Sequence, residues 1–125
     1  MPAEPPKRLR LGRDRRIQQS RDFARTRLEG RRLVHGCLIA NWRSLPASAP
    51  GRVGLVVSRK VGNAVVRSRV RRLLRESYRL HQHELLEPLD LVLVARPSIA
   101  GRVFADVERD FLATMRKAAL VKTPA

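Results

Sequence analysis

The sequence predicts an α+β sandwich, in which one small mixed sheet of about four strands is packed by helices in the order αβββαβα. Two short apolar runs are typical of buried strands: Val53–Val57, which is rich in β-branched residues, and Leu89–Ala95. Between and after them, apolar residues recur at helical spacing, which predicts amphipathic helices docked on the sheet. The 125 residues suffice for one domain with its own core.

The N-terminal third combines an arm, a helix and a strand region. Residues 1–16 hold three prolines and many positive charges but few apolar groups, which predicts a flexible basic arm. The next segment is expected to be a helix, with Ser20 as its N-cap and Gly30 as a left-handed stop. Arg31–Arg43 is interrupted by a glycine, which predicts two short strands or one bent strand. Cys37, the single cysteine, lies in this region and is expected to be a buried free thiol.

The rest of the chain is expected to alternate helices and strands. The most regular helix is expected at Ala64–Leu80, after the strand at Val53–Val57 and a polar turn. A last amphipathic helix follows the strand at Leu89–Ala95, and its apolar stripe consists of Val103, Phe104, Val107, Phe111, Met115 and Ala118. These boundaries place one domain at residues 17–120 and a C-terminal tail at residues 121–125.

The charge of the chain indicates its partner. Lysine and arginine number 27 against 11 acidic residues, which gives a formal charge of +16. Such an excess of positive charge makes the folded chain repel itself. Nucleic acid is the favoured partner, because contacts with its phosphates neutralise the charge and release condensed counterions. Arginine outnumbers lysine, and its guanidinium can both grip a phosphate and stack on a base, which favours RNA. We expect a cytoplasmic protein that does not bind membranes, because apolar runs of membrane-spanning or secretory type are missing.

The helix around Val66–Arg79 has the strongest functional signal. On a helical wheel, an arc of about 100° suited to docking on a sheet holds Val66, Val70, Leu73, Leu74 and Ser77. One flank is a file of arginines at i, i+4 spacing, made of Arg67, Arg71, Arg75 and Arg79. The other flank carries Arg69 and Arg72. Because like charges at this spacing destabilise a helix, the pattern indicates contact with several phosphates of an RNA backbone.

An ordinary solvated face is the alternative for this helix. Exposed helices usually mix charge signs, whereas six arginines accompany a single glutamate here, which favours RNA. The turn before the helix adds Arg59 and Lys60, and the backbone amides at the helix N-terminus favour anions. Together they predict one continuous basic surface.

Catalytic chemistry is not indicated by the remaining polar residues. His81, His83 and Glu84 lack the spacing and the fourth ligand of a metal site, so a solvated helix end is favoured. A second group, Asp106, Glu108 and Asp110, would spread around a helix at i, i+2 spacing instead of converging on a metal. No nucleophile has a convincing partner. We expect no active site and no cofactor in this chain.

The stretch GLVVSRKVGNAVVRSRVRRLLRESYR, residues 54–79, resembles the bacterial ribonuclease P protein family. The family hallmark is a buried strand, a basic turn and the helix motif Ala-Val-x-Arg-Asn-Arg-x-Lys-Arg-x-x-Arg. The matching residues are Ala64, Val65, Arg67, Arg69, Arg72 and Arg75, and Arg71 replaces the lysine. Weaker similarity extends over residues 16–119, including Phe23 at an aromatic position of the first helix.

The resemblance implies a protein subunit of ribonuclease P with the fold called ribosomal protein S5 domain 2-like. The RNA subunit would perform the cleavage that removes the 5′ leader of precursor tRNA, with Mg²⁺ bound through that RNA. Residues implied in binding the catalytic RNA are Arg59, Lys60, Arg67, Arg69 and Arg72. Residues implied in a cleft for the leader are Phe23, Arg27, Ser68, Arg71 and Arg75. The protein is expected to be a monomer without RNA.

Three positions depart from the family pattern. Ser68 replaces the asparagine of the hallmark, and Arg27 stands where a second aromatic is often found. The aromatic of the second strand falls at Asn41, and its neighbour Trp42 should point to the opposite face. The alternative function is a ribosomal or other structural RNA-binding protein. A DNA-binding regulator is disfavoured, because uniform arginines suit backbone contact and not base reading.

Overall fold

The computed structural model describes residues 15–122, in which one four-stranded sheet is combined with three α-helices. The strands are β1 (Arg31–His35), β2 (Leu38–Ser44), β3 (Arg52–Val56) and β4 (Leu89–Ala95). The helices are α1 (Ser20–Glu29), α2 (Ala64–His81) and α3 (Phe104–Lys117), with short 3-10 turns at Gln82–Glu84 and Pro97–Ile99. The predicted α+β class and the order αβββαβα are confirmed.

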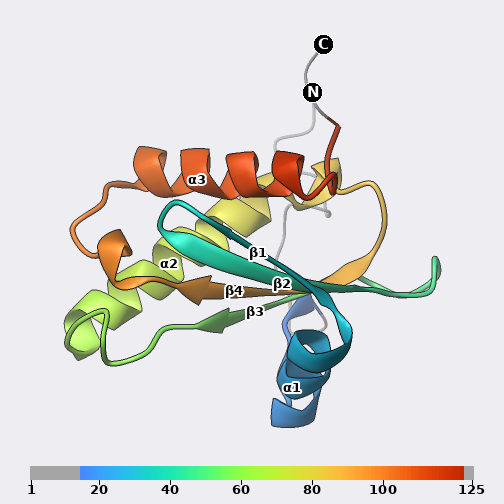
Figure 1. Cartoon of the computed structure of the whole chain (residues 1–125), viewed down its shortest axis with the longest axis horizontal. Coiled ribbons are helices and arrows are strands. Elements are labelled where there is room, and N and C mark those ends of the chain that lie inside the picture. The colour runs from blue at the N-terminus through green and yellow to red at the C-terminus, as the bar shows by residue number, and fades with distance from the viewer. Residues whose placement is uncertain (1–14, 123–125) are drawn as a thin grey trace, which may run out of the picture.

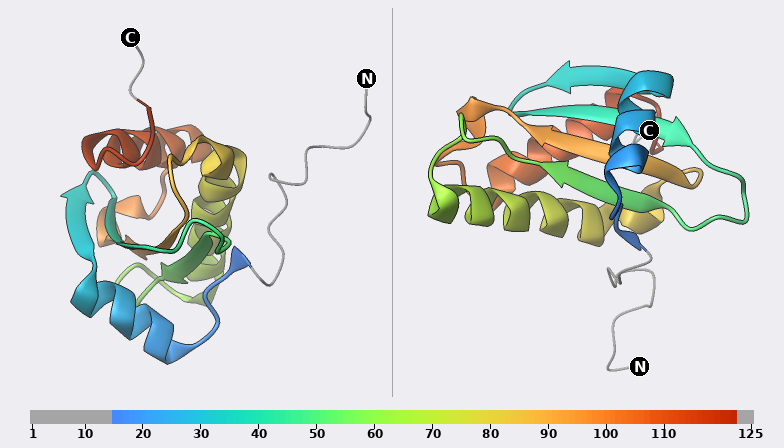
Figure 2. Two further views of the ribbon diagram at one scale, coloured as in Figure 1. Left: turned by 90° about the vertical axis from the view of Figure 1, so that its right-hand side faces the viewer. Right: turned by 90° about the horizontal axis from the view of Figure 1, so that it is seen from below.

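The sheet is mixed and has the strand order β1-β2-β4-β3. β2 pairs in antiparallel fashion with both β1 and β4, whereas β3 and β4 are parallel neighbours joined through α2. Helices α2 and α3 lie on one face of the sheet and α1 lies on the other (Figure 1, and Figure 2, left). The edge strand β3 therefore lies between α1 and α2, the two helices that bear most of the predicted site residues.

The core lies between the sheet and helices α2 and α3. Strand residues alternate between the two faces, and β4 contributes Leu89, Leu91, Leu93 and Ala95 to this core. The largest side chains that the helices bury here are Tyr78, Phe111, Leu74 and Met115. Trp42 of β2 belongs to the same core and is only 8% exposed. The prediction that Trp42 points to the face opposite Asn41 is thus confirmed, since Trp42 packs in this core and faces away from α1.

A buried ion-pair network attaches α1 to the opposite face. Asp90 of β4 is fully buried and accepts two hydrogen bonds of 2.8 Å from Arg52 and one of 3.1 Å from Arg43. Arg52 also reaches Asp22 of α1, at 3.4 Å. A buried carboxylate is tolerated only when it is well paired, so these contacts hold β3, β4 and the start of α1 in one arrangement.

Both predicted caps of the first helix are wrong. Gln19 is the N-cap and makes no side-chain cap hydrogen bond, so Ser20 is the first residue of α1. Gly30 ends the helix in an extended conformation, with φ −90°, and not in the left-handed region. Glycine is required here because of space and not because of backbone conformation. A Cβ atom at Gly30 would lie 2.1 Å from the carbonyl oxygen of Trp42. Glycine lets the end of α1 approach β2 closely.

The strand region after α1 forms two strands and not one bent strand. Gly36 makes the turn between β1 and β2 in the left-handed region, with φ 58°, where glycine is favoured. Cys37 is a buried free thiol, as predicted, but it lies in this turn and not in a strand. Burial, together with the neighbouring Asp110, raises the pKa of Cys37 to about 12. The thiol therefore stays protonated at neutral pH.

The predicted arm and tail fall largely outside the described residues, which leaves 1–14 and 123–125 without a structural account. Arg16, at the end of the predicted arm, forms a β-bridge with Val53 of β3. Val121, at the start of the predicted tail, is buried and forms a bridge with Leu85. Within residues 15–122, no helix has the length and apolar character needed to cross a membrane.

Candidate nucleic-acid interface

Helix α2 docks on the sheet through the predicted apolar arc. The side chain of Asn63 caps its N-terminus by accepting a hydrogen bond of 3.0 Å from the backbone amide of Val66. Val70, Leu74 and Ser77 are buried, and Val66 and Leu73 are half-buried. Tyr78 is also buried, which the wheel did not predict, because the arc is wider than expected at the C-terminal end of the helix.

The arginines of α2 divide into paired and unpaired groups. Arg79 forms an ion pair with Glu76, and Arg69 donates a hydrogen bond of 2.9 Å to the carbonyl oxygen of Arg102. The predicted file of four is thereby shortened, because its last member is neutralised within its own helix. Among the described residues, no acidic partner is found for Arg67, Arg71, Arg72 and Arg75. Within residues 15–122 these four guanidinium groups therefore form no ion pair, although the Nε atom of Arg67 is buried.

Phe23, Arg71 and Arg75 converge on one hollow at the edge of the sheet. This hollow of about 180 Å³ lies between α1, β3 and α2, and is lined by Arg16, Ile17, Phe23, Val53, Gly54, Leu55, Arg71 and Arg75. The ring of Phe23 is half-buried against Gly54, and the two α2 arginines come from consecutive helical turns. Arg16 is a further cation at this place, which the sequence reasoning missed because it assigned Arg16 to the arm.

Ser68 and Arg27 do not line this hollow. Ser68 lines a different depression together with Ala64, Val65, Arg69, Arg72 and Leu73. Ser68 lies one helical turn before Arg72 on α2, and both line this depression. Arg27 is exposed on α1, one helical turn after Phe23, and is not among the residues that line the hollow. The predicted cleft group is thus divided by the structure.

The basic turn before α2 continues the surface of the helix. Backbone hydrogen bonds from Val61 to Ser58 and from Gly62 to Arg59, of 3.1 and 3.2 Å, hold the turn. Val61 is buried and anchors it, whereas Arg59 and Lys60 are exposed. Both cations therefore project into solvent next to the amides of the helix N-terminus.

The polar residues considered for metal binding have structural partners. In the part of the chain that the structure describes, no group of His, Cys, Asp and Glu side chains is arranged to hold a metal ion. His81 lies between Glu84 and Glu108, with 2.8 Å from its Nε2 to the Glu108 oxygen. Asp110 accepts a hydrogen bond of 3.0 Å from the backbone amide of Cys37. The expectation of a merely solvated helix end at His81 is therefore wrong, because this side chain links α2 to α3.

This arrangement defines a small α+β protein with an arginine helix beside an open, partly aromatic hollow, a surface suited to RNA. A sequence model described as Ribonuclease P matches residues 11–119. The chain belongs to the family of bacterial ribonuclease P protein components. It is thus a protein subunit of the ribozyme that acts as a tRNA-processing endonuclease, and association with the ribonuclease P RNA follows from the family.

Individual relatives agree with this assignment. The ribonuclease P protein component of Gluconacetobacter diazotrophicus is 39% identical over 104 residues, which cover 82% of this chain and 90% of the relative. The RNase P protein of Staphylococcus aureus has a similar fold, with a TM-score of 0.79 over 86% of this chain and 98% of that one, at 22% identity. The RNase P protein from Thermotoga maritima gives a TM-score of 0.73 over 82% and 96%, at 25% identity.

Proposed function

We propose that this chain binds the catalytic RNA and the 5′ leader of precursor tRNA at the same time, through the two flanks of α2. The observation that supports this most directly is the hollow where Phe23 of α1 meets Arg71 and Arg75 of α2. An aromatic ring beside unpaired guanidinium groups suits single-stranded RNA, because bases stack on rings and phosphates bind cations. The leader of a precursor tRNA is such a strand.

The second flank is proposed to face the catalytic RNA. Arg69 and Arg72 project from α2 on the side away from Phe23, and line a depression with Ser68. The exposed Arg59 and Lys60 precede the same helix, so the cations follow one another along its N-terminal half. Such a row contacts the phosphates of a folded RNA without reading sequence. We include Arg67 in this group, as the family motif implies.

Leader binding is proposed to rest mainly on Phe23, Arg71 and Arg75, with Arg16 as an additional cation. Stacking of one base on an aromatic ring contributes about 1–3 kcal/mol. Arg27 and Ser68, which the resemblance also implies, lie outside the hollow and could contact only nucleotides beyond it. We further propose that the protein is a monomer without RNA and that Mg²⁺ enters through the RNA, which performs the cleavage.

A cleavage titration tests this function. Purified protein is added to the catalytic RNA at physiological Mg²⁺, and removal of the leader from precursor tRNA is followed. We expect the protein to lower the substrate concentration needed for half-maximal cleavage. An unchanged requirement, combined with tight binding to ribosomal RNA, would support the alternative of a structural RNA-binding protein of the ribosome.

A further inference from the structure

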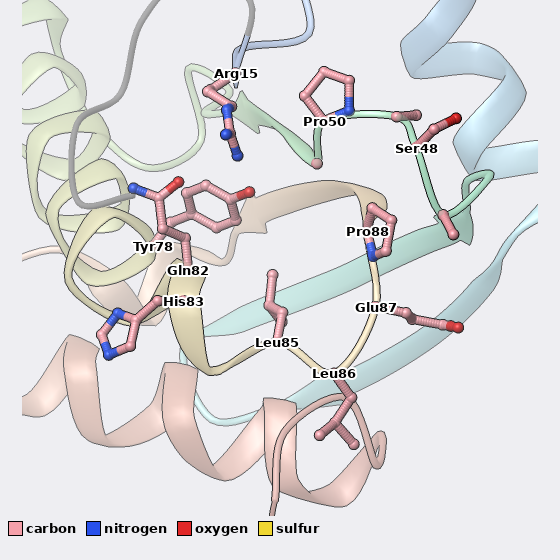
Figure 3. A pocket seen from close by; sticks show the side chains of 13 residues that line it. Arg15, Ser48, Pro50, Tyr78, Gln82, His83, Leu85, Leu86, Glu87 and Pro88 are labelled. Carbon is pink, nitrogen blue, oxygen red and sulfur yellow. The ribbon is translucent and has the colours of Figure 1, made fainter. Parts of the chain in front are cut away.

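Arg52, the first residue of the edge strand β3, lies beside the start of α1. The loop of residues 45–51, which borders a hollow of about 500 Å³, leads into this strand (Figure 3). Because side chains alternate along a strand, Arg52 and Gly54 point to the same face of the sheet. On that face Gly54 lies against the ring of Phe23, and the guanidinium of Arg52 lies 3.4 Å from the carboxylate of Asp22. Two positions of β3 thus meet two consecutive residues of α1.

The orientation of the Arg52 guanidinium is fixed by the sheet. Strand pairing places Arg52 opposite Asp90 of β4, whose side chain is fully buried. Nε and Nη2 of Arg52 each donate a hydrogen bond of 2.8 Å, one to each carboxylate oxygen of Asp90. A bidentate pair of this kind holds the planar group in one orientation, so the remaining nitrogen, Nη1, is aimed at Asp22. The sheet therefore offers α1 an attachment point with a defined direction.

The first turn of α1 depends on this attachment. Its N-cap, Gln19, makes no side-chain cap hydrogen bond. Within residues 15–122, Arg52 is the one ion-pair partner of Asp22. The second half of the helix is held differently, by the buried Thr26 and by the close approach of Gly30 to β2. Loss of the contact between Arg52 and Asp22 should therefore loosen the first turn without unfolding the rest of the helix.

We propose that Arg52 is a positioning residue for leader binding: its contact with Asp22 fixes the start of α1 and so places the ring of Phe23 where an unpaired base can stack. The inference rests on the proposed function, which assigns Phe23 to the leader. Neither Arg52 nor Asp22 is among the residues that line the hollow of Phe23, so both act through the ring. The buried network around Asp90 thereby serves the leader site as well as the stability of the fold.

Asp22→Asn tests the contact in the enzyme assembled with catalytic RNA, because positioning and simple electrostatics predict opposite results. Removing a negative charge from a basic protein favours RNA binding. A displaced ring should instead weaken binding of leader-bearing precursor, by about fivefold for partial loss of one stacking contact. Mature tRNA, which lacks the leader, should bind at least as well as before. Glu29→Gln removes the same charge from the exposed end of α1 and is the matched control, for which precursor affinity should not fall.

A double-mutant cycle shows whether the contact acts through the ring. Phe23→Ala alone should weaken precursor binding, and adding Asp22→Asn should cause no further loss, because the ring that Asp22 positions is gone. Asp22→Glu keeps the charge and should retain most of the affinity. The inference is overturned if Asp22→Asn causes the same loss with and without Phe23, or no loss in either background. Precursor binding that is insensitive to Phe23→Ala would instead contradict the proposed function itself.

Arg52→Lys tests the other partner without changing the net charge. Lysine is a single point donor, so it cannot hold both oxygens of Asp90 and also aim a donor at Asp22. Precursor affinity should fall as it does for Asp22→Asn, and urea denaturation shows whether the variant is folded. Unchanged affinity in a folded Arg52→Lys variant would overturn the inference. If that variant does not fold, Asp22→Asn decides, because it leaves the pair of Arg52 and Asp90 intact.

A measurement without RNA follows the ring directly. The chain has three phenylalanines, Phe23, Phe104 and Phe111, so fluorine NMR of protein labelled with fluorophenylalanine can follow each ring. Phe23→Leu assigns the signal of interest. Asp22→Asn should shift or broaden that signal and leave the other two, which arise from α3, unchanged. A Phe23 signal identical to that of the parent protein, at an unchanged melting temperature, would overturn the inference whatever the RNA measurements give.

Discussion

The ring of Phe23 lies directly against Gly54, and a Cβ atom added to Gly54 would be only 2.4 Å from Cε1 of the ring. α1 can place an aromatic side chain on the edge strand β3 because that position has no side chain of its own. The same contact brings Phe23 to the hollow that Arg71 and Arg75 line. One glycine thus determines whether an aromatic ring and the arginines of α2 can act on the same strand of RNA.

Gly54→Ala should displace Phe23 and weaken binding of precursor tRNA. Overpacking at this contact should also lower the free energy of unfolding by about 1–3 kcal/mol. Urea denaturation measures the stability, and equilibrium binding of leader-bearing precursor to the assembled enzyme measures the function. Gly51→Ala, where the added Cβ makes only ordinary contacts, is the matched control. If the Gly54→Ala variant bound the precursor as tightly as the parent protein, the position of Phe23 would have no role in leader binding.

Arg71→Ala and Arg75→Ala should each weaken binding of leader-bearing precursor about tenfold, as expected for a lost charged hydrogen bond. Mature tRNA, which lacks the leader, should bind almost as well as before. The readout is the ratio of the two dissociation constants for each variant, with Arg116→Ala on the exposed face of α3 as the control. Equal losses for precursor and mature tRNA would exclude these residues from a leader cleft.

Arg69→Ala should weaken assembly with the catalytic RNA and leave discrimination between precursor and mature tRNA unchanged. Its side chain lies on the flank opposite to Phe23, where it also donates a hydrogen bond to Arg102. Loss of one phosphate contact should reduce the slope of log K against log salt by about one. The slope is measured by titrating RNA at several salt concentrations. A slope identical to that of the parent protein would argue against this contact.

Asp90→Asn should destabilise the protein strongly, because it leaves Arg52 and Arg43 without their buried carboxylate. Breaking a buried ion pair costs about 3–5 kcal/mol, and the lower end is expected here because both arginines are partly exposed. Chemical denaturation measures the loss. Glu29→Gln removes a partner of Arg25 in an exposed pair and should cost less than about 0.5 kcal/mol. Similar losses for both variants would show that the network under α1 is not a main source of stability.

The contact of His81 with two glutamates should make stability depend on pH. Burial alone would lower the pKa of His81, but hydrogen bonds to Glu84 and Glu108 more than offset this and raise it above the ordinary value of 6.5. The protonated form is therefore favoured by folding. Its contribution to stability should be complete below about pH 6.5 and should be lost as the pH rises through the higher pKa of the folded state.

Unfolding free energies between about pH 5.5 and 8.5 test this dependence around the ordinary histidine pKa. His81→Gln should remove the part of the pH dependence that arises from this contact, and the other titrating groups are common to both proteins. Parallel curves for the parent protein and the variant would mean that the link between α2 and α3 does not depend on the charge of His81.

Local pattern was sufficient to predict the elements of the fold. The strand at Leu89–Ala95 matches its predicted bounds, and α2 differs from its predicted end by one residue. In both segments apolar residues recur at the period of the element, two residues in a strand and about 3.6 in a helix. Each element can therefore be recognised from its own residues. The caps at Ser20 and Gly30 were predicted wrongly. Ser20 is the first residue of α1, and Gly30 is extended where the end of the helix closely approaches Trp42.

The sequence by itself determined that α2 has one apolar arc and two basic flanks, because helical geometry follows from residue spacing alone. Only the tertiary structure decided which of these cations act together. It brought Phe23 and Arg16 to Arg71 and Arg75, neutralised Arg79 with Glu76, and placed Ser68 in a separate depression with Arg69 and Arg72. These relationships depend on how α1, β3 and α2 pack, and packing joins residues whose distance along the chain carries no periodic signal.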